Sequence, residues 1–144
     1  MESDLDLDKQ VCFALYSASR SLTALYRPLL GKLGLTYPQY LVMLVLWERG
    51  DVSVKRLGEA LMLDSGTLSP LLKRLESAGL VTRRRDPGDE RSVVIALTPS
   101  GTSLRHQASS IPRNIVQATG VPLRELVQLR DTLKSITATV SSTG

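Results

Sequence analysis

The chain has 144 residues, of which 42% are hydrophobic and 22% charged, and this balance predicts one compact globular domain with its own core. It contains one cysteine, Cys12, and one histidine, His106, which exclude an intrachain disulfide, a four-thiolate zinc site and a zinc site built on several histidines. No apolar run approaches the roughly 20 residues that cross a bilayer, and residues 1–6 are acidic where a signal peptide is basic. We therefore expect a soluble, cytoplasmic protein with reduced thiols, no metal and no membrane partner.

The net charge of +4 is compatible with a nucleic-acid partner but does not by itself predict one. Residues 53–98 contain eight basic and six acidic side chains, so this stretch is only weakly basic. A DNA-binding face would therefore have to come from the placement of particular side chains.

Apolar spacing and capping signals predict four helices, a hairpin and two further helices, in that order. Asp8, Ser53 and Thr98 are the expected N-caps, and Pro112 is expected to kink or break the helix that follows the hairpin. The start of the fourth helix stays open, because Pro70 belongs in a first turn. The expected elements are helices over about 8–30, 38–49, 54–62 and 65–78, strands over 80–85 and 92–97 joined by a turn at 86–89, a helix from 98 onward, and a last helix over about 126–140.

Two short helices across a turn that contains glycine, followed by a hairpin, are typical of a winged helix-turn-helix. The predicted fold is mainly α with a small β-hairpin wing, in which residues 53–98 form the DNA-binding lobe. The long helices at both ends of the chain carry apolar stripes that a domain of this size does not cover alone. These stripes predict a dimer.

The fourth helix begins with small polar residues and carries two basic side chains further along. Small residues let the backbone approach a DNA groove, and Lys73 and Arg74 are able to reach phosphates or guanine edges. An ordinary capped helix with a solvated basic end explains the same pattern equally well. The candidate DNA-binding residues of this helix are Ser65, Gly66, Thr67, Ser69, Pro70, Lys73 and Arg74.

Arginines flank the expected hairpin turn on both sides, with three at 83–85 and one at Arg91. A tip of this kind suits a minor groove or two phosphate backbones. The alternative is a strand edge that charge protects from aggregation. We take Arg84, Asp89 and Arg91 as candidate DNA-binding residues, and expect Asp89 and Arg91 to bond one another and set the shape of the wing.

Residues 89–98, DERSVVIALT, resemble the D-x-R-x5-L-T wing signature of the MarR family of bacterial transcription regulators. The resemblance extends over nearly the whole chain and implies a winged-helix homodimer that binds a pseudo-palindromic operator in double-stranded DNA. It also implies that the first, fifth and sixth helices form the dimer interface, which assigns about 8–31 and 99–141 to dimerisation within a single MarR-type domain over 1–144.

Cys12 lies near the start of the first helix, and all four tyrosines of the chain follow it between positions 16 and 40. A lone cysteine is often only a small buried hydrophobe. Phenolic hydroxyls, however, donate to a thiolate and stabilise it, and a helix N-terminus acts in the same direction. The tyrosines therefore favour a reactive thiol, with Tyr16, Tyr26 and Tyr37 as candidate thiolate-supporting residues.

Distance restricts which of these tyrosines belong to the same subunit as the cysteine. Tyr26 follows Cys12 by fourteen residues, which is about 21 Å along a continuous helix. No tyrosine side chain spans that distance. If Tyr26 contacts Cys12, it must come from an antiparallel second subunit, and oxidation of the thiol would then be coupled to the spacing of two DNA-reading helices.

Several separate segments closely resemble the organic hydroperoxide resistance regulators, a group within the MarR family. They are QVCF at 10–13, Tyr26, TYPQYL at 36–41 and LDSGTLSPLLKR at 63–74. In that group the cysteine matching Cys12 senses peroxide, and the tyrosines matching Tyr26 and Tyr37 reach it from the partner subunit. The resemblance implies a repressor that leaves its operator when an organic hydroperoxide oxidises Cys12.

Some members of this group carry a second, resolving cysteine, and this chain has none. The resemblance is thus to the one-cysteine type, in which the sulfenic acid on Cys12 combines with a small-molecule thiol in a mixed disulfide or oxidises further. Apolar neighbours, with Phe13, Leu15 and Trp47 as candidates, would favour organic peroxides over hydrogen peroxide, although plain core packing accounts for them equally well.

Two other functions compete with a redox-sensing repressor. A MarR-type regulator controlled by a non-covalently bound aromatic ligand would leave Cys12 as a buried structural residue, and Cys12→Ser would not change its induction. A thiol peroxidase would need a resolving thiol, and no catalytic histidine or arginine clusters near Cys12 in the sequence. His106 is most simply a surface helix residue. We therefore expect no enzyme, no catalytic residue and no cofactor.

Overall fold

The computed structural model describes residues 2–143 of the chain, with side chains from residue 4 to residue 142. Between Ser109 and Ser110 the chain divides into two compact units. The elements in chain order are η1 (Glu2–Leu5), η2 (Leu7–Lys9), α1 (Val11–Gly31), α2 (Tyr37–Arg49), β1 (Val52–Ser53), α3 (Val54–Leu61), α4 (Ser65–Ser77), β2 (Val81–Asp86), β3 (Asp89–Leu97), α5 (Pro99–Ala108), α6 (Ile111–Thr119) and α7 (Leu123–Thr143).

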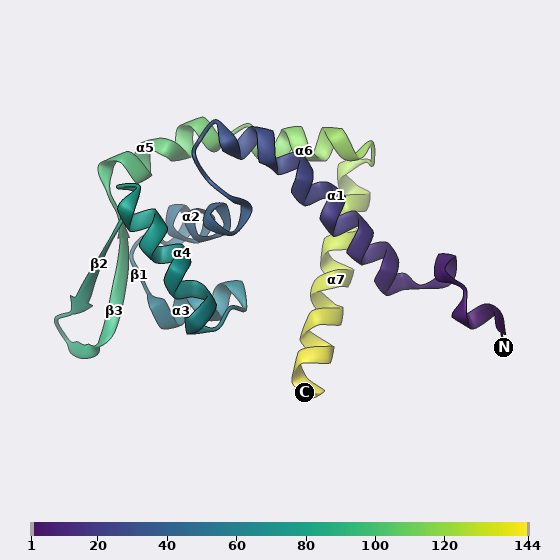
Figure 1. The fold of residues 1–144 in the computed structure, drawn as a ribbon, viewed down its shortest axis with the longest axis horizontal. Coiled ribbons are helices and arrows are strands. Elements are labelled where there is room, and N and C mark those ends of the chain that lie inside the picture. The colour runs from purple at the N-terminus through teal and green to yellow at the C-terminus, as the bar shows by residue number, and fades with distance from the viewer. Residues whose placement is uncertain (1, 144) are drawn as a thin grey trace. The chain divides into compact units, whose positions relative to one another are not determined.

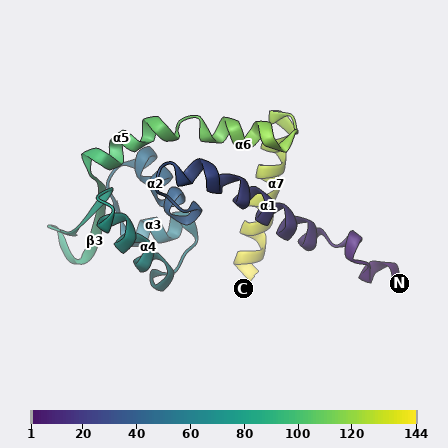
Figure 2. The same cartoon turned by 45° about the horizontal axis from the view of Figure 1, so that its top comes forward.

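The expected winged helix-turn-helix is present in the first unit. Helices α3 and α4 lie beside a three-stranded antiparallel sheet of order β1-β3-β2, from which the β2–β3 hairpin extends on one side (Figure 1). The hairpin keeps this position beside α3 and α4 in the rotated view (Figure 2). The fold class read from the sequence is therefore confirmed, with β1 as an additional short strand that pairs Val52 with Ile95.

The caps of the winged-helix helices follow local sequence signals. The Ser53 hydroxyl accepts from the Arg56 backbone N–H at 3.1 Å and begins α3, while the Thr98 hydroxyl accepts from the Gly101 N–H at 3.1 Å and begins α5. Both N-caps were expected from the sequence, and both side chains satisfy backbone donors that would otherwise have no partner. Gly79, with φ +76°, ends α4 in the left-handed conformation that glycine adopts without strain.

Packing of α4 accounts for the core of the winged helix. Its buried residues, spaced as a helical stripe, are Leu68, Leu71, Leu72 and Leu75, as the periodicity predicts. They pack in a core that also contains the fully buried Leu57 of α3 and Ile95 of β3. Burial of several leucines, each worth roughly 1.5–3 kcal/mol, holds α4 in place while its opposite face stays in solvent.

Three details of the predicted elements differ from the structure, although the start of the fourth helix expected near residue 65 is confirmed. Asp8 is part of η2 and does not cap α1. The residue at the N-cap position is Gln10, and α1 begins at Val11. The Gln10 side chain donates to the carbonyls of Asp4 and Asp6 and so connects the start of α1 to the preceding turns. Pro70 lies in the second turn of α4 rather than the first, on the exposed face, where water can satisfy the carbonyl that its missing N–H leaves free.

The third difference is the hairpin turn, which is shorter than expected. β3 begins at Asp89 rather than Ser92, and Asp86 pairs directly with Asp89, so only two residues make the turn. The Asp86 carboxylate accepts from the Gly88 N–H at 2.9 Å and closes it.

Helices α1 and α2 complete the first unit. The Gly31 end of α1 and the left-handed Gly34, with φ +72°, lead to α2, whose Thr36 and Gln39 form a reciprocal capping box. Leu30 of α1 and Met43 of α2 are buried, whereas the N-terminal half of α1 buries no residue. Within residues 2–143, no helix combines the length and apolar content that a bilayer crossing requires.

The second unit consists of α6 and α7. The expected break at Pro112 is confirmed, because α5 ends at Ala108, the residue whose carbonyl the missing Pro112 N–H would have met. Gly120, with φ +69°, ends α6 and turns the chain into α7. On α7, Leu129 is 50% exposed and Ile136 45% exposed, so this helix presents an uncovered apolar stripe.

Candidate functional site

The seven residues of α4 that the sequence singled out for DNA contact all lie on one surface. Each is exposed, whereas the leucines between them are buried, so small polar side chains and the two cations share the solvent face of this helix. No hydrogen bond or ion pair of the Lys73 or Arg74 side chain occurs within the described part of the chain, which leaves both charges available to a ligand.

The N-terminus of α4 is held by Asp64. Its carboxylate accepts from the Thr67 backbone N–H at 2.7 Å, and hydrogen bonding from Thr67 holds the pKa of Asp64 below its usual range. The charged cap fixes the turn between α3 and α4 and therefore the direction in which Ser65 and Thr67 are presented.

The arginines of the wing differ in the contacts that their side chains make. Arg84 forms an ion pair with Asp51 at 3.0 Å, whereas the Arg91 guanidinium has no partner among the described side chains. Asp89 and Arg91 do bond one another, through the Arg91 backbone N–H at 3.0 Å rather than through the guanidinium. The bond shapes the turn and leaves the Arg91 charge exposed at the wing.

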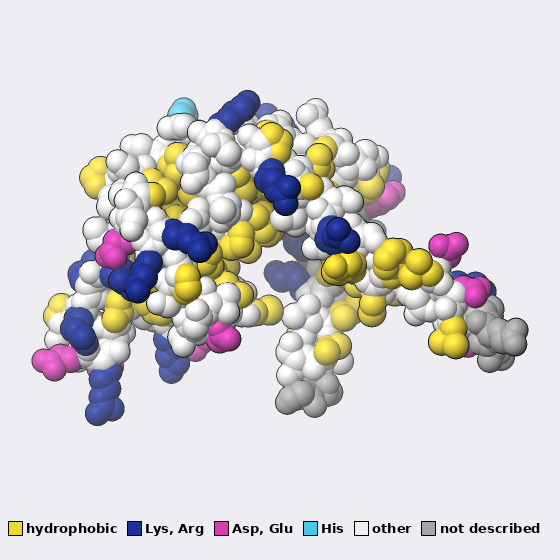
Figure 3. Space-filling view, viewed as in Figure 1, with side chains coloured by type: hydrophobic (Ala, Val, Ile, Leu, Met, Phe, Trp, Pro, Cys, Tyr) yellow, Lys and Arg dark blue, Asp and Glu magenta, His cyan; other side chains and the backbone are white. Residues whose placement is uncertain are grey.

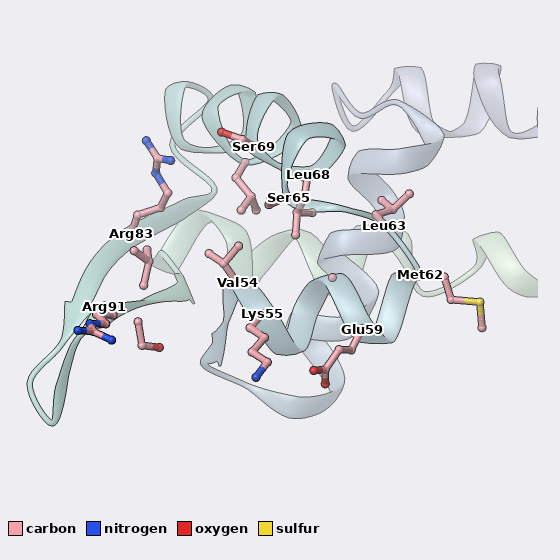
Figure 4. Close-up of a pocket in the computed structure, with 14 residues that line it drawn as sticks. Val54, Lys55, Glu59, Met62, Leu63, Ser65, Leu68, Ser69, Arg83 and Arg91 are labelled. Atoms are coloured by element: carbon pink, nitrogen blue, oxygen red, sulfur yellow. The ribbon is translucent and has the colours of Figure 1, made fainter. Parts of the chain in front are cut away.

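A cavity of about 700 Å³ separates the wing from α3 and α4 (Figure 4). Its walls combine apolar side chains such as Val54 and Leu68 with the polar Ser65 and Ser69 of α4. Arg83 and Arg91 stand on the wing side of this cavity. The wing is therefore attached to the helices at its base and open beneath its outer half.

Cys12 lies in the first turn of α1 and is exposed. Exposed apolar residues surround it along the same part of the helix, with Val11 at 69%, Phe13 at 43% and Tyr16 at 60% exposure. Figure 3 shows hydrophobic side chains gathered along this end of α1. The Arg20 guanidinium carbon stands 5.3 Å from the centroid of the Tyr16 ring, one turn further on.

Three tyrosines gather at the other end of α1. The Tyr26 ring centroid lies 4.8 Å from that of Tyr37 and 5.7 Å from that of Tyr40, and Tyr40 contacts Trp47 edge-on at 6.4 Å. Burial, with Tyr37 and Tyr40 as neighbours, raises the pKa of Tyr26 to about 12, and burial also raises the pKa values of Tyr37 and Tyr40. These phenols are therefore protonated at neutral pH and able to donate hydrogen bonds.

The structure does not bring Cys12 and the tyrosine cluster together within one chain. α1 is one continuous helix from Val11 to Gly31, and its single internal proline, Pro28, follows Tyr26. The separation of about 21 Å expected between Cys12 and Tyr26 therefore applies. Trp47, expected as a neighbour of Cys12, contacts the tyrosine cluster instead.

Two contacts between distant parts of the winged helix could not be predicted from the sequence. Asp51 pairs with Arg84, and the Trp47 indole N–H donates to the Gly101 carbonyl at 2.9 Å. These residues are 33 and 54 positions apart, and no spacing rule connects them. His106, expected as a surface residue, is exposed in the last turn of α5.

Tyr26 gives a pH dependence that can be measured. The unfolded chain ionises this phenol near pH 10 and the folded chain only near pH 12, so the stability contributed by the neutral phenol is complete below pH 10 and is lost as the pH rises towards 12. In a Cys12→Ser background, which removes thiol ionisation, we expect the free energy of unfolding to fall more steeply in this range with Tyr26 than with Tyr26→Phe. Urea unfolding across the range measures it, and parallel curves would contradict the assignment.

A winged helix with exposed cations on its second helix and on its wing defines a DNA-binding protein of the helix-turn-helix class. Residues 24–107 match the family model described as transcriptional regulator SarA/Rot. The organic hydroperoxide resistance transcriptional regulator of Bacillus subtilis is 48% identical over 97% of both chains. Reduced AbfR bound to DNA superposes with a TM-score of 0.80 at 32% identity, covering 96% of this chain and 97% of that one. AbfR is a Staphylococcus epidermidis protein, and its disulfide form matches with a TM-score of 0.64 at 34% identity over 94% of this chain and 95% of that one.

The chain belongs to the MarR family of transcriptional regulators and, within it, to the organic hydroperoxide resistance regulators of the one-cysteine type. It is a regulator that binds DNA and not an enzyme. Both resemblances read from the sequence are confirmed.

Proposed function

We propose that this protein is a homodimeric repressor that binds a pseudo-palindromic operator while Cys12 is reduced and leaves it when an organic hydroperoxide oxidises Cys12. The observation that carries the proposal is that the single cysteine lies exposed among uncovered apolar side chains at one end of α1, with three protonated tyrosines at the other end. The cytoplasm is the compartment that fits a repressor with a reduced thiol.

An antiparallel partner makes this arrangement a complete site. If two copies of α1 pair in opposite directions, the Cys12 end of one meets the tyrosine end of the other, and Tyr26 and Tyr37 of the partner subunit donate to the Cys12 thiolate. The exposed apolar faces of α1 and α7 are what such a dimer would bury, so about 8–31 and 99–141 serve as the dimerisation helices of one MarR-type domain. Tyr16 supports the thiolate from within the same subunit.

The chemistry needs no metal or cofactor. The Cys12 thiolate attacks the terminal oxygen of the hydroperoxide, an S–O bond forms, the O–O bond breaks, and the alkoxide leaves and is protonated to an alcohol. The sulfur is oxidised by two electrons and the peroxide is reduced. Because the chain has no second cysteine, a small-molecule thiol then attacks the sulfenic acid, forming a mixed disulfide and releasing water. The added group enlarges the site and changes the spacing of the two DNA-reading lobes.

Fluorescence anisotropy at fixed salt tests this function. We expect the reduced protein to bind its own upstream promoter DNA tightly, and to release it after addition of cumene hydroperoxide with a small thiol such as cysteine. Binding that ignores the peroxide would remove Cys12 from the mechanism. An absence of binding to any upstream promoter DNA would overturn the operator assignment.

The predicted DNA contacts have their own test. Arg91→Ala is expected to weaken promoter binding about 10- to 100-fold and to reduce its salt dependence, because it removes an exposed guanidinium that has no partner among the described residues of the chain. Lys32→Ala, which removes the same charge from the exposed segment after α1, is the matched control and is expected to change binding little. Equal effects of the two variants would show that only total charge matters.

The cavity between the wing and α4 favours one second candidate, control by a non-covalently bound aromatic ligand. Its apolar walls and the nearby Arg83 and Arg91 would suit an aromatic acid. In that case an aromatic carboxylate such as benzoate would release DNA from wild type and from Cys12→Ser alike. In the redox mechanism only the peroxide acts, and only on wild type.

A further inference from the structure

Three consecutive arginines of β2 each have a partner on a different element. Arg83 pairs with Glu76 of α4 at 3.2 Å, Arg84 pairs with Asp51 just before β1 at 3.0 Å, and Arg85 donates to the Glu90 carbonyl on β3 at 2.8 Å. Of these, the bond of Arg84 connects elements that are not neighbours in the sheet, because β3 lies between β1 and β2.

The register places Arg84 at the base of the wing, and we call its ion pair with Asp51 the clamp. Arg84 pairs with Val94, and Val94 also pairs with Ser53, the last residue of β1. Beyond this row and up to the tip of the wing, the sheet consists of β2 and β3 alone. A two-stranded ribbon is marginally stable by itself and twists more freely than a wider sheet.

Two ion pairs, one on each face of the sheet, connect the wing to the rest of the first unit at this point: Arg83 with Glu76 of α4 and Arg84 with Asp51. Side chains alternate between the two faces of a strand, so Arg84 points away from the face on which Arg83 lines the cavity beside α4 (Figure 4). That cavity leaves the outer wing without helix packing beneath it. On the opposite face, the ion pair reaches across β3 from Arg84, in the last three-stranded row, to Asp51, the residue before β1.

We propose that Asp51 and Arg84 act together as positioning residues that aim the wing at DNA, and that Arg84 acts through Asp51 rather than through a phosphate. The inference rests on the proposed DNA-binding function. It revises the role expected for Arg84 from the sequence, while Arg91, whose guanidinium has no partner among the described residues, keeps its role as a direct contact.

The two roles of Arg84 predict opposite effects of one substitution. Asp51→Asn removes a negative charge near DNA and frees Arg84, so a direct phosphate contact predicts tighter binding. The clamp predicts weaker binding, by about threefold to fivefold for an exposed ion pair. Arg84→Gln should weaken binding by the same factor, and the double variant no further, with an unchanged slope of binding against salt concentration.

The experiment measures promoter affinity of the reduced protein by anisotropy over a range of salt for wild type, the two single variants and the double variant. Exchanging the charges, Asp51→Arg with Arg84→Asp, should restore affinity if the pair is a clamp and should not if position 84 contacts DNA. Thermal unfolding of every variant establishes that it is folded. Tighter binding by Asp51→Asn, or a salt slope about one unit smaller in Arg84→Gln, would overturn the proposal.

Arg91→Gln separates this proposal from the proposed function. If wild type binds and Arg91→Gln has a lower affinity and a smaller salt slope, DNA binding through the wing is supported. The variants at positions 51 and 84 then test only the role of the Asp51–Arg84 pair. If wild type binds no promoter DNA, the proposed function fails and the clamp with it.

Discussion

Replacing Cys12 by serine is expected to leave operator binding of the reduced protein unchanged and to abolish its release by organic hydroperoxide. Serine is close to cysteine in size, and Cys12 makes no buried contact within its own subunit, where it is exposed, so we expect the substitution to leave the fold unchanged. Its hydroxyl is not oxidised by peroxides. For wild type we expect at least a hundredfold loss of affinity on oxidation, which corresponds to a coupling free energy of about 3 kcal/mol.

A second cysteine variant makes this prediction specific for the site rather than for the presence of a thiol. Ser21 is exposed on α1, nine residues after Cys12, which places it on the opposite side of the helix. Ser21→Cys in the Cys12→Ser background returns one thiol to α1 away from the proposed tyrosine contacts. We expect this double variant to bind DNA and to remain bound in the presence of peroxide and a small thiol.

Anisotropy and intact mass spectrometry measured on the same samples check the result. Wild type should gain the mass of the small thiol as it releases DNA, while both variants should stay on DNA. Release from Cys12→Ser at the same peroxide concentration would assign induction to another group. Release from the variant with the thiol at position 21 would show that any modification of α1 is sufficient, and would remove the tyrosines from the mechanism.

The parts of the fold that local chemistry determines could be predicted from the sequence. The hydroxyls of Ser53 and Thr98 accept from backbone N–H groups three residues later, so each cap can be predicted from a segment of four residues. The burial of Leu68, Leu71, Leu72 and Leu75 follows from helical periodicity. The distance between Cys12 and Tyr26 needed only the rise of one uninterrupted helix.

Contacts between distant segments could not be predicted in this way. The two-residue strand β1 is too short to show any alternation, and it exists because Val52 pairs with Ile95. Asp51 looks like an ordinary loop residue until the sheet brings Arg84 to it. The tyrosine cluster was foreseen as a set of residue types, but Tyr40 joins it because α2 packs beside the end of α1.

The second large effect is expected at Gly101, where Gly101→Ala should destabilise the protein by about 2–3 kcal/mol. Gly101 is buried in the first turn of α5, and a Cβ at this position would overlap the carbonyl oxygen of Leu80 and press on the Leu97 side chain at 3.1 Å. The Leu80 carbonyl cannot retreat freely, because it accepts the Thr98 N–H at 3.1 Å. The overlap with backbone outweighs the roughly 1 kcal/mol that alanine gains over glycine in a helix.

Gly31→Ala is the matched control, since it makes the same change at the end of a helix where a Cβ would meet no described atom within 4 Å. We expect it to be neutral or stabilising by up to about 1 kcal/mol. Thermal unfolding at one protein concentration compares the two variants. Equal stabilities would show that α5 shifts away from Leu80 at little cost.

The effect of Gly101→Ala should extend to DNA binding, because the crowded contact lies where three parts of the winged helix meet. Leu80 connects the end of α4 to β2, and the Gly101 carbonyl accepts the Trp47 indole N–H from α2 at 2.9 Å. Displacing α5 therefore moves both the base of the wing and the helix that carries Tyr37 and Tyr40. We expect a weaker operator complex even where the variant remains folded. Unchanged operator affinity in a destabilised but folded Gly101→Ala would show that the junction contributes to stability alone.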